Sequence, residues 1–475
     1  MQQRPAARPD TALWTLVIAS VAGFMAALDN LVVTTALPSI REDLGGGLGD
    51  LEWTVSAYTL TFAVLLMMGA ALGDRFGRRL LFTVGLGIFT AASAGAALAP
   101  GMEALIAARA VQGLGAAIMM PLTLTLLSAA VPPERRGAAF GIWGAVNGLA
   151  VAAGPLIGGT LTEHLSWQWI FWINVPLGAA LVPLALLRLE ESRGPSPRLD
   201  LPGTALVSAG LFGIVYALIR GNGDGWSSPR VLTGLIGGTL LLAVFVLYET
   251  RANNPMLPMR LFRSRAFSSV NAASLFMFVG MFGSIFLLSQ FLQDVGGYSP
   301  MEAGVRMLPW TAMPMIAAPI AGTLSDRFGG QPVVVTGLLL QATGLALLAL
   351  VVSPGVSYPE LVPSLVISGL GMGFFFAPTA NLVMSSVRLE EQGIASGSNN
   401  ALREVGGALG VATMSAVFSA QGGYASARQF VDGLTPALWA GTAAVVCAAV
   451  AAVLVPRQTG RVQEPSAERP DPVTA

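Results

Sequence analysis

Apolar runs of about twenty residues follow one another along almost the whole chain, and this pattern constrains the fold more than any other feature. A helix of that length crosses a hydrocarbon core of about 30 Å, because each residue adds about 1.5 Å. Of the 475 residues, 54% are hydrophobic and only 11% are charged. Ordinary soluble domains have roughly 25% charged residues. The sequence therefore predicts an all-α polytopic membrane protein.

The limits of the apolar runs predict fourteen transmembrane helices. The predicted spans are 13–38, 52–72, 79–99, 103–129, 137–161, 168–188, 201–220, 231–249, 268–293, 303–323, 332–353, 360–385, 396–419 and 434–455. An even number of spans places both termini on one side of the membrane. That side carries 19 arginines and the other side 4. Because positive loops stay on the cytoplasmic side, both termini are expected to be cytoplasmic.

Residue types that are absent or single exclude several functions. All 26 basic residues are arginine, so the chain lacks the lysine of a Walker A loop or of a pyridoxal phosphate Schiff base. One histidine, His164, and one cysteine, Cys447, cannot form a zinc site, a disulfide or a bis-histidine haem site. The net charge of zero gives no indication of nucleic-acid binding. We expect no cofactor and no metal, and arginine in place of every lysine indicates a GC-rich bacterial genome.

Three short strings occur twice in the same order, which predicts an internal repeat. They are Asp-Arg-Phe-Gly at 74 and 326, Gly-Leu-Gly at 113 and 369, and a Gly-x-x-x-Gly pair at 137 and 393. The offsets, 252, 256 and 256, place matching strings eight helices apart on the same side of the membrane. Chance recurrence is the alternative, and the common order and offset argue against it. Parallel repeats of six helices form transporters whose two halves move about a central site.

The repeat and the composition together predict five regions in a 6+2+6 arrangement of helices. They are a cytoplasmic tail at 1–12, a six-helix bundle at 13–188, a linker with two inserted helices at 189–267, a second six-helix bundle at 268–455 and a disordered cytoplasmic tail at 456–475. The last region is rich in proline, glutamate and arginine, a composition that cannot form a packed core.

Charged residues inside the predicted spans are the first candidates for function. Asp29 lies in the first span, Arg109 in the fourth and Glu404 in the thirteenth. A charge inside a span costs about 2.5–3.5 kcal/mol on insertion scales, so each is expected to face a partner or a cavity. Arg109 and Gln112 are three residues apart and share a helix face. Burial favours the neutral form of a carboxyl group, as a reversible proton carrier requires. A purely structural role is the alternative for each.

Three motifs resemble signatures of the major facilitator superfamily. The segment 69–79, GAALGDRFGRR, resembles the loop signature G-x-L-a-D-R-x-G-R-[RK], with Ala70 at the leading glycine. The segment 109–117, RAVQGLGAA, resembles the motif of the fourth helix, and this resemblance implies that Arg109 assists proton movement. The segment 150–159, AVAAGPLIGG, resembles the antiporter motif G-x-x-x-G-P-x-x-G-G of the exporting branches, with Ala150 at the first glycine.

Four further segments resemble motifs of the fourteen-helix drug:proton antiporter family within that superfamily. They are LDNLVVTTALP at 28–38, WQWIFWINVPLG at 167–178, the glutamine-containing segment at 288–304 and NNALREVGGALG at 399–410. The first departs from the family pattern at Asn30, Leu31 and Thr34, and the second has Gln168 in place of arginine. By these matches the chain is identified as a member of this family over residues 12–455.

The motifs and the repeat assign candidate roles to named residues. Proton coupling is assigned to Asp29, Arg109 and Glu404. The conformational gate is assigned to Asp74, Arg75, Gly77, Arg78, Asp326 and Arg327, and the antiporter kink to Gly154, Pro155, Gly158 and Gly159. The substrate-cavity candidates are Asn30, Thr34, Gln112, Asn147, Gln290, Asn400, Arg403 and Phe375. Asn147 and Arg403 are related by the repeat offset of 256. Most Met and Phe side chains are expected to face lipid or to pack.

The resemblance implies a proton-coupled antiporter that exports small, largely apolar drugs or antibiotics across a bacterial cell membrane. Its energy source is the proton gradient, and its partners are the drug, protons and the lipid bilayer, with the chain acting as a monomer. A proton-coupled symporter is the first alternative, and the Gly154-Pro155 pair argues against it. A membrane-embedded enzyme is disfavoured because few nucleophiles or bases lie in the spans. A receptor has no need of two matching halves.

Overall fold

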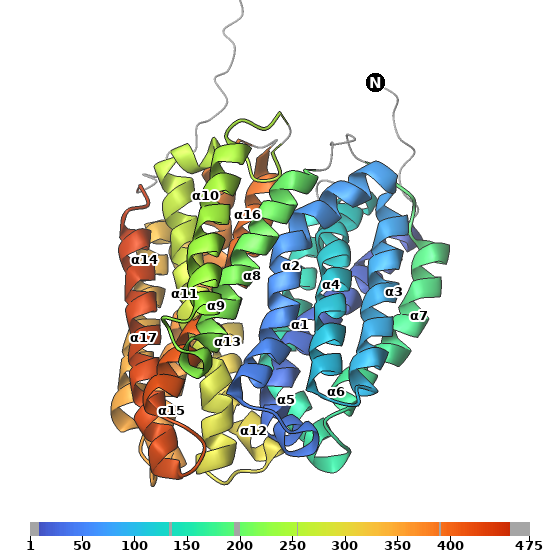
Figure 1. Ribbon diagram of the computed structural model, residues 1–475. Helices are drawn as coiled ribbons and strands as arrows, with labels where there is room; N and C mark the ends of the chain where they lie inside the picture. Colours follow the sequence, from blue (N-terminus) through green and yellow to red (C-terminus); the bar gives the residue numbers. More distant parts are fainter. Residues whose placement is uncertain (1–8, 133–134, 194–199, 254, 389–390, 457–475) are drawn as a thin grey trace, which may run out of the picture.

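The computed structural model describes residues 9–132, 135–193, 200–253, 255–388 and 391–456. The described residues form long helices that run between two faces of the molecule, and no β-strand occurs among them (Figure 1). Both described ends of the chain lie at one face, which we call the terminal face, and we call the other the opposite face (Figure 1). The predicted tail at 456–475 lies outside the described residues except for Pro456.

The first seven helices form one side of the bundle, the N-terminal half (Figure 1). They are α1 (Pro9–Leu44), α2 (Leu48–Phe76), α3 (Arg78–Ala97), α4 (Met102–Ala130), α5 (Arg136–His164), α6 (Trp169–Trp172) and α7 (Asn174–Arg188). α6 and α7 together make one crossing. α1 begins within the predicted tail at 1–12, because Pro9 is suited to the first position of a helix, where its missing N–H costs nothing.

The remaining helices form the inserted hairpin and the C-terminal half. The hairpin consists of α8 (Leu201–Asp224), α9 (Pro229–Leu232), a π-helical turn η2 (Thr233–Gly237) and α10 (Gly238–Glu249). After the short turn η3 (Leu261–Arg263), the C-terminal half consists of α11 (Arg265–Gln290) with the π-helical turn η4 (Phe291–Val295), α12 (Pro300–Thr311), α13 (Met313–Phe328), α14 (Gly330–Val351), α15 (Tyr358–Ser385), α16 (Gln392–Gln421) and α17 (Ala427–Val453). α8 packs against both α2 and α16 and so touches both halves.

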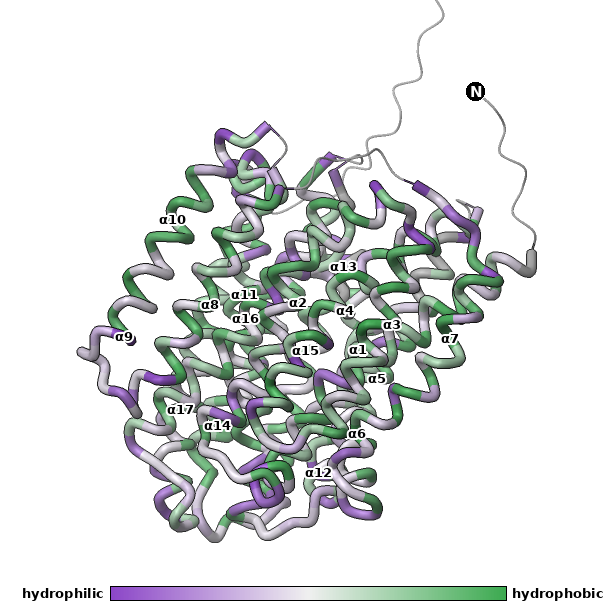
Figure 2. Tube along the Cα trace, turned by 45° about the vertical axis from the view of Figure 1, so that its right-hand side comes forward, coloured by the Kyte–Doolittle hydropathy of each residue, from purple (hydrophilic) through white to green (hydrophobic). Residues whose placement is uncertain are grey.

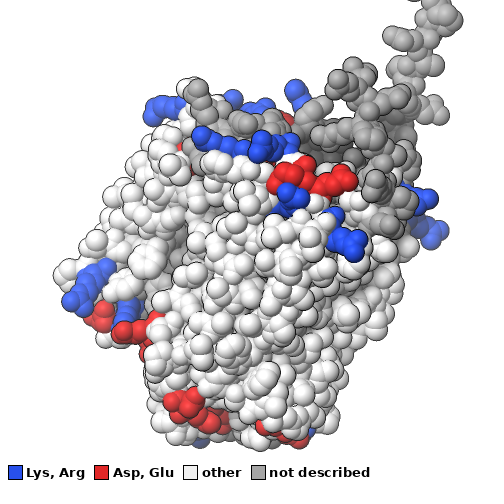
Figure 3. Space-filling view, turned by 90° about the vertical axis from the view of Figure 1, so that its right-hand side faces the viewer, with Lys and Arg blue, Asp and Glu red and all other residues white. Residues whose placement is uncertain are grey.

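The described helices agree with the predicted spans, with one informative exception. Twelve are long and apolar enough to cross a membrane, and the bent α5 makes a thirteenth. α16 fails that test because Asn399, Asn400, Arg403 and Glu404 interrupt its apolar sequence, yet its 30 residues run between the two faces beside α11 and α17. Figure 2 shows the apolar residues along the middle of the helices, and Figure 3 shows charges gathered at the two ends around an uncharged belt.

The internal repeat is present in the helix packing. A Cβ atom added at Gly113 of α4 would lie 2.5 Å from the carbonyl oxygen of Tyr58 in α2. A Cβ added at Gly369 of α15 would lie 2.5 Å from the carbonyl oxygen of Trp310 in α12. Both pairs follow the offsets of the repeated strings. Because only glycine allows so close an approach, the two halves share the same backbone packing at this crossing.

The two halves meet toward the opposite face and part toward the terminal face. Ser289 of α11 donates a hydrogen bond to the carbonyl oxygen of Thr34 in α1 (3.0 Å). Glu163, at the end of α5, accepts hydrogen bonds from Ser299, which caps α12, and from the amide of Met301 within α12. By contrast, Cβ atoms added at Gly144 and Gly148, in the terminal-face part of α5, would find no heavy atom within 4 Å. The bundle is therefore closed at the opposite face.

Candidate functional site

Asp29 of α1 and Arg109 of α4 form a buried ion pair in the middle of the N-terminal half. The Asp29 Oδ2 atom accepts from Arg109 Nη1, and both side chains are fully buried. The Oδ1 atom accepts from Gln112 Nε2 at 2.7 Å and from Asn174 Nδ2 at 3.1 Å. Side chains of α4 and α7 therefore converge on one carboxylate of α1, and the predicted face shared by Arg109 and Gln112 is the one that holds it.

The guanidinium of Arg109 is fixed by further contacts. Its Nε donates to the carbonyl oxygen of Thr54 at 3.1 Å, and its Nη1 donates to Gln112 Oε1 at 2.8 Å. The guanidinium lies over the ring of Tyr58, 4.4 Å from the centroid. Its Nη2 is buried and has no hydrogen-bond partner in the described part of the chain. The pair is neutral as a unit, so a proton on Asp29 would leave a buried cation that needs a new partner.

Two partners of this cluster were not among the sequence candidates. Ser93 of α3 accepts from Gln112 Nε2 at 2.8 Å, and Asn174 begins α7. Ser93 gives no sequence signal, because small hydroxyl residues are common in transmembrane helices. Asn174 lies in the I-N-V-P string of the motif at 167–178, and an amide inside a span was the available signal.

The Asp29–Arg109 cluster lies in the N-terminal half, although the backbone packing around it is repeated in the C-terminal half. Gly154 packs on Leu31 and Gly410 packs on Val279, so α1 and α11 are related by an offset of 248. Asp29 then corresponds to Met277. By the offset of 256, Arg109 corresponds to Leu365. Both Met277 and Leu365 are fully buried apolar residues. The repeat thus supplies matching scaffolds, and among the described residues the buried ion pair at this level belongs to the N-terminal half.

Arg403 of α16 lies among aromatic rings of the C-terminal half. Its guanidinium carbon is 5.2 Å from the ring centroid of Phe376, 5.3 Å from that of Phe278 and 5.9 Å from that of Phe375. Its Nε and Nη2 atoms are buried without a hydrogen-bond partner in the described residues. The structure therefore brings together two of the substrate-cavity candidates, Arg403 and Phe375.

Glu404 follows Arg403 but faces another direction. Neighbouring residues of a helix point about 100° apart. No ion pair joins Glu404 to Arg403 in the described structure. The third residue predicted for proton coupling is therefore not bonded to its neighbour in the described structure.

The other substrate-cavity candidates are more dispersed. Thr34 is buried and bonds its own helix at Leu31, while Asn30 is buried with Oδ1 unpartnered in the described residues. Asn147 donates to the carbonyl oxygen of Trp143 at 2.7 Å. Gln290 lies toward the opposite face, where it accepts a hydrogen bond from the Tyr424 hydroxyl.

Asn400 is exposed, whereas its neighbour Asn399 is buried. Asn399 Nδ2 donates to Asn271 Oδ1 at 3.0 Å and to Ser274 Oγ at 2.9 Å. These bonds join α16 to α11 within the C-terminal half. The sequence candidates did not include this amide cluster, because adjacent asparagines at 399 and 400 do not show which of them points inward.

The predicted gate lies at the terminal face and is bonded within the N-terminal half. Arg78 Nε donates to Asp74 Oδ1 at 2.8 Å, and Gly77 between them has φ of +121°. The amide of Arg78 donates to the carbonyl oxygen of Ser192, after α7, at 2.9 Å. Gly329, the repeat equivalent of Gly77, has φ of +88°.

Among the other gate residues, the described arginine side chains lie against their own helices. The guanidinium carbons of Arg75 and Arg327 lie 5.3 and 5.8 Å from the ring centroids of their own neighbours, Phe76 and Phe328. The side chain of Asp326 lies outside the described part of the structure.

The antiporter motif lies where α5 bends and crosses α1 and α12. The helix bends by 40° between Ala150 and Ala152, four residues before Pro155, whose missing N–H leaves a carbonyl group unbonded. A Cβ added at Gly158 would lie 2.8 Å from the carbonyl oxygen of Val32, and one added at Gly159 would lie 2.1 Å from that of Pro300. A Cβ added at Gly154 would lie 2.7 Å from the Cβ atom of Leu31. The motif thus allows close contact between the two halves.

An ion pair that the sequence did not indicate closes the opposite face. Arg41 Nη2, at the end of α1, donates to Asp294 Oδ1 in η4 at 2.9 Å. The guanidinium also lies over the ring of Tyr424, 4.2 Å from the centroid. The two charges are 253 residues apart in the chain and belong to different halves. Separating the halves at this face must break this contact.

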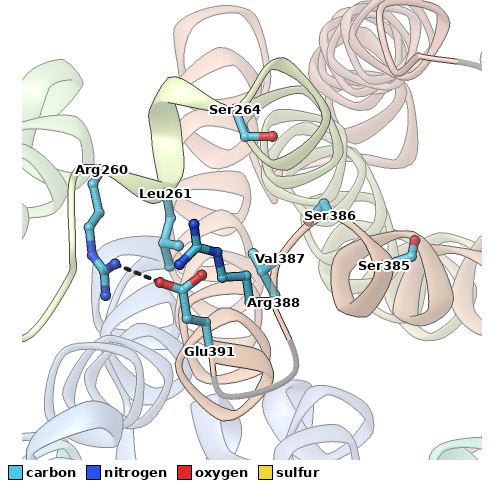
Figure 4. A pocket seen from close by; sticks show the side chains of 8 residues that line it. All are labelled: Arg260, Leu261, Ser264, Ser385, Ser386, Val387, Arg388 and Glu391. Carbon is cyan, nitrogen blue, oxygen red and sulfur yellow. Dashed lines mark ion pairs between the residues drawn. The ribbon is translucent and has the colours of Figure 1, made fainter. Parts of the chain in front are cut away.

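At the terminal face of the C-terminal half, several charged side chains line a pocket (Figure 4). The pocket has a volume of about 410 Å³ and lies between the segment before α11 and the turn between α15 and α16. Arg260 and Glu391 form an ion pair of 2.7 Å at its edge, beside Arg388. No group of three or more histidine, cysteine, aspartate or glutamate residues suited to a metal ion occurs in the described ranges.

Known proteins resemble the chain in sequence and in fold. The tetracenomycin C resistance and export protein of Streptomyces glaucescens is 36% identical over 412 residues, 86% of this chain and 76% of the relative. The puromycin resistance protein of Streptomyces alboniger is 38% identical over 409 residues, 85% of this chain and 81% of the relative.

One solved structure that resembles the fold is a bacterial homologue of the human lysosomal transporter Spinster, in an inward-facing and unoccupied conformation. Its TM-score is 0.67 at 17% identity, with 94% of this chain and 97% of that chain covered. The family model of the Major Facilitator Superfamily matches residues 19–411. Since that model and these relatives span most of the sequence, the chain belongs to the Major Facilitator Superfamily of membrane transporters.

Proposed function

We propose that the chain is a proton-coupled antiporter that exports small, largely apolar drugs or antibiotics across the bacterial cytoplasmic membrane by alternating access. The Asp29–Arg109 pair carries this proposal, because it is a buried carboxylate whose charge is balanced by a single side chain. Such a group exchanges a proton for a salt bridge. The names of the relatives, which describe resistance to or export of tetracenomycin C and puromycin, support export as the direction.

The orientation in the membrane follows from the distribution of arginine. In the sequence, the predicted loops on the side of the termini hold 19 arginines and those on the other side hold 4, which favours a cytoplasmic terminal face. Figure 3 shows the blue side chains concentrated at that end. With this orientation the described state is closed to the exterior and open toward the cytoplasm. Asp29, paired with Arg109, is then in the deprotonated form expected after proton release inside.

The cycle uses these residues in two steps. In the outward-open state a proton from outside water binds the Asp29 carboxylate, and the bond to Arg109 breaks. In the inward-open state Asp29 releases that proton to the cytoplasm and pairs with Arg109 again. Drug and proton favour opposite-facing states, and this difference in affinity drives net export. Beside Arg403, the Phe375 ring is fully buried, whereas the Phe376 ring is partly exposed, and there we expect a planar apolar substrate to bind.

The direction of proton movement tests the proposal against symport. In inside-out vesicles with an acidified lumen, adding a transported drug should make the lumen more alkaline, because drug enters as protons leave. A symporter would not consume the gradient when its solute is added outside. The Asp29→Asn variant should show no drug-dependent change. Glu103→Gln, which removes an exposed carboxylate near the opposite face, should behave like the wild type. A lumen that stays acidic after the transported drug is added outside wild-type vesicles would refute antiport.

A further inference from the structure

Glu52 is a buried carboxyl group that the proposed cycle does not use. It lies in α2 close to the opposite face and is 2% exposed. Its carboxyl group lies near Ser415 of α16, in the other half, and Ser415 Oγ is itself buried without a hydrogen-bond partner in the described residues. Glu52 Oε2 has no hydrogen-bond partner in the described structure, and no ion pair there includes Glu52. An unpaired carboxylate in such a place is costly, so the closed state requires the neutral acid.

A cavity connects this carboxyl group with the opposite face. It has a volume of about 330 Å³ and is lined by residues of α2, α8 and α16, among them Glu52, Arg220, Asn222 and Ser419. Asn222 Nδ2 in α8 donates to the carbonyl oxygen of Ala416 in α16. The inserted helix α8 therefore forms one wall of the cavity. Arg220, at the mouth, is exposed and forms no ion pair with Glu52 in the described structure.

Few charged or titratable groups act on Glu52. Asp50 lies two residues earlier on α2 and repels a negative charge at Glu52. Tyr424, which follows α16, lies close enough to feel the Glu52 charge and is covered by Arg41. Arg41 is already paired with Asp294. α8 contributes Arg220 at the cavity mouth. None of these groups neutralises an ionised Glu52 in the closed state as Arg109 neutralises Asp29.

We propose that Glu52 is a second proton-binding site, loaded from the opposite face through this cavity, and that its protonated form holds α2 against α16. A proton from cavity water binds the carboxylate, and the resulting O–H donates to the Ser415 hydroxyl across the interface. When the halves part at this face, water reaches the carboxyl group and the proton returns to that water. Acid at the opposite face therefore favours closure there.

This proposal rests on the alternating access of the proposed function and adds a distinct role for the inserted hairpin. Asp29 and Arg109 neutralise each other within one half, so their proton need not control the interface directly. Glu52 lies between the halves, and α8 builds its cavity. Proton loading at Glu52 would assist the step in which the opposite face closes, the step that a proton entering from outside must drive in an exporter.

Pulsed electron paramagnetic resonance can test the site without depending on transport. Spin labels at Glu42→Cys in α1 and Gln421→Cys in α16, both exposed at the opposite face, report the distance between the halves. Cys447→Ala removes the native thiol. In the labelled wild type, the long-distance population should grow as the pH rises from about 5.5 to about 8. In Glu52→Gln, which is neutral at every pH, it should stay at its acidic value throughout.

Two further variants make the result decisive. Glu103→Gln removes an exposed acid near the same face and should leave the wild-type profile unchanged. Ser415→Ala removes the hydrogen-bond acceptor and should raise the long-distance population at acidic pH. If Glu52→Gln retains the pH dependence of the wild type, the proposal is overturned, while drug-driven proton flux in vesicles still decides antiport separately. A wild type with no pH dependence of the distance would overturn it as well.

Discussion

The carboxylate of Asp29 and the guanidinium of Arg109 form an ion pair, and both side chains are fully buried from solvent. Gln112 contacts both members, since it donates to Asp29 and accepts from Arg109. This geometry keeps the ionised carboxylate in a membrane span and also makes the pair sensitive to one proton. Burying an ion pair costs desolvation free energy, and removing one partner destabilises the protein more, because it leaves an uncompensated buried charge.

The first prediction concerns that half-completed pair. Arg109→Ala should destabilise the protein by about 3–5 kcal/mol, because it leaves a buried carboxylate without a counter-charge. Adding Asp29→Asn to Arg109→Ala should recover part of the loss, since no charge is then left unpaired. Thermal unfolding of the purified variants measures both. Strict additivity of the two single effects would show that the residues do not interact in solution.

The second prediction concerns the repeated close approach of helices. Gly113→Ala and Gly369→Ala should each destabilise the protein by about 1–3 kcal/mol, because the new methyl group would overlap a backbone carbonyl oxygen 2.5 Å away. Gly144→Ala is the matched control, since a Cβ there meets no atom within 4 Å. It should be neutral or stabilising in a helix. Equal melting temperatures for all three variants would disprove the packing described above.

The third prediction concerns closure at the opposite face. Arg41→Ala should increase the population that is open at this face, because the ion pair with Asp294 and the stacking on Tyr424 are lost together. The charge-swapped double variant, Arg41→Asp with Asp294→Arg, should restore closure more than either single reversal does. Distances between spin labels at 42 and 421 provide the measurement. No difference between the single and double reversals would rule out the ion pair as a latch.

The fourth prediction concerns orientation. A cysteine at Gly223, exposed on the opposite face, should react with an impermeant thiol reagent added to intact cells. A cysteine at Glu190, exposed near the terminal face, should not react until the cells are opened. The reverse labelling pattern would place the terminal face outside.

Much of the fold follows from local sequence, because the apolar runs are long and the turn glycines recur. The limits of α1 could not be predicted well, since its ends continue into polar residues beyond the apolar run. α16 shows the reverse case, because its polar residues serve the interior and weaken the transmembrane signal. In the site, the three-residue spacing of Arg109 and Gln112 predicted that both side chains lie on one face of α4, and both bond Asp29. Ser93, Asn174, Arg41 and Glu52 were missed because their importance depends on contacts with distant helices.

The proton balance of drug binding tests the role of Asp29 most directly. A drug added to the detergent-purified protein in weakly buffered solution with a pH-sensitive dye should release protons from the wild type and from Glu103→Gln. Asp29→Asn keeps nearly the same size but cannot titrate, so it should bind a neutral drug without releasing a proton. If Asp29→Asn releases as many protons as the wild type, Asp29 is not the carrier, and Glu404 becomes the next candidate.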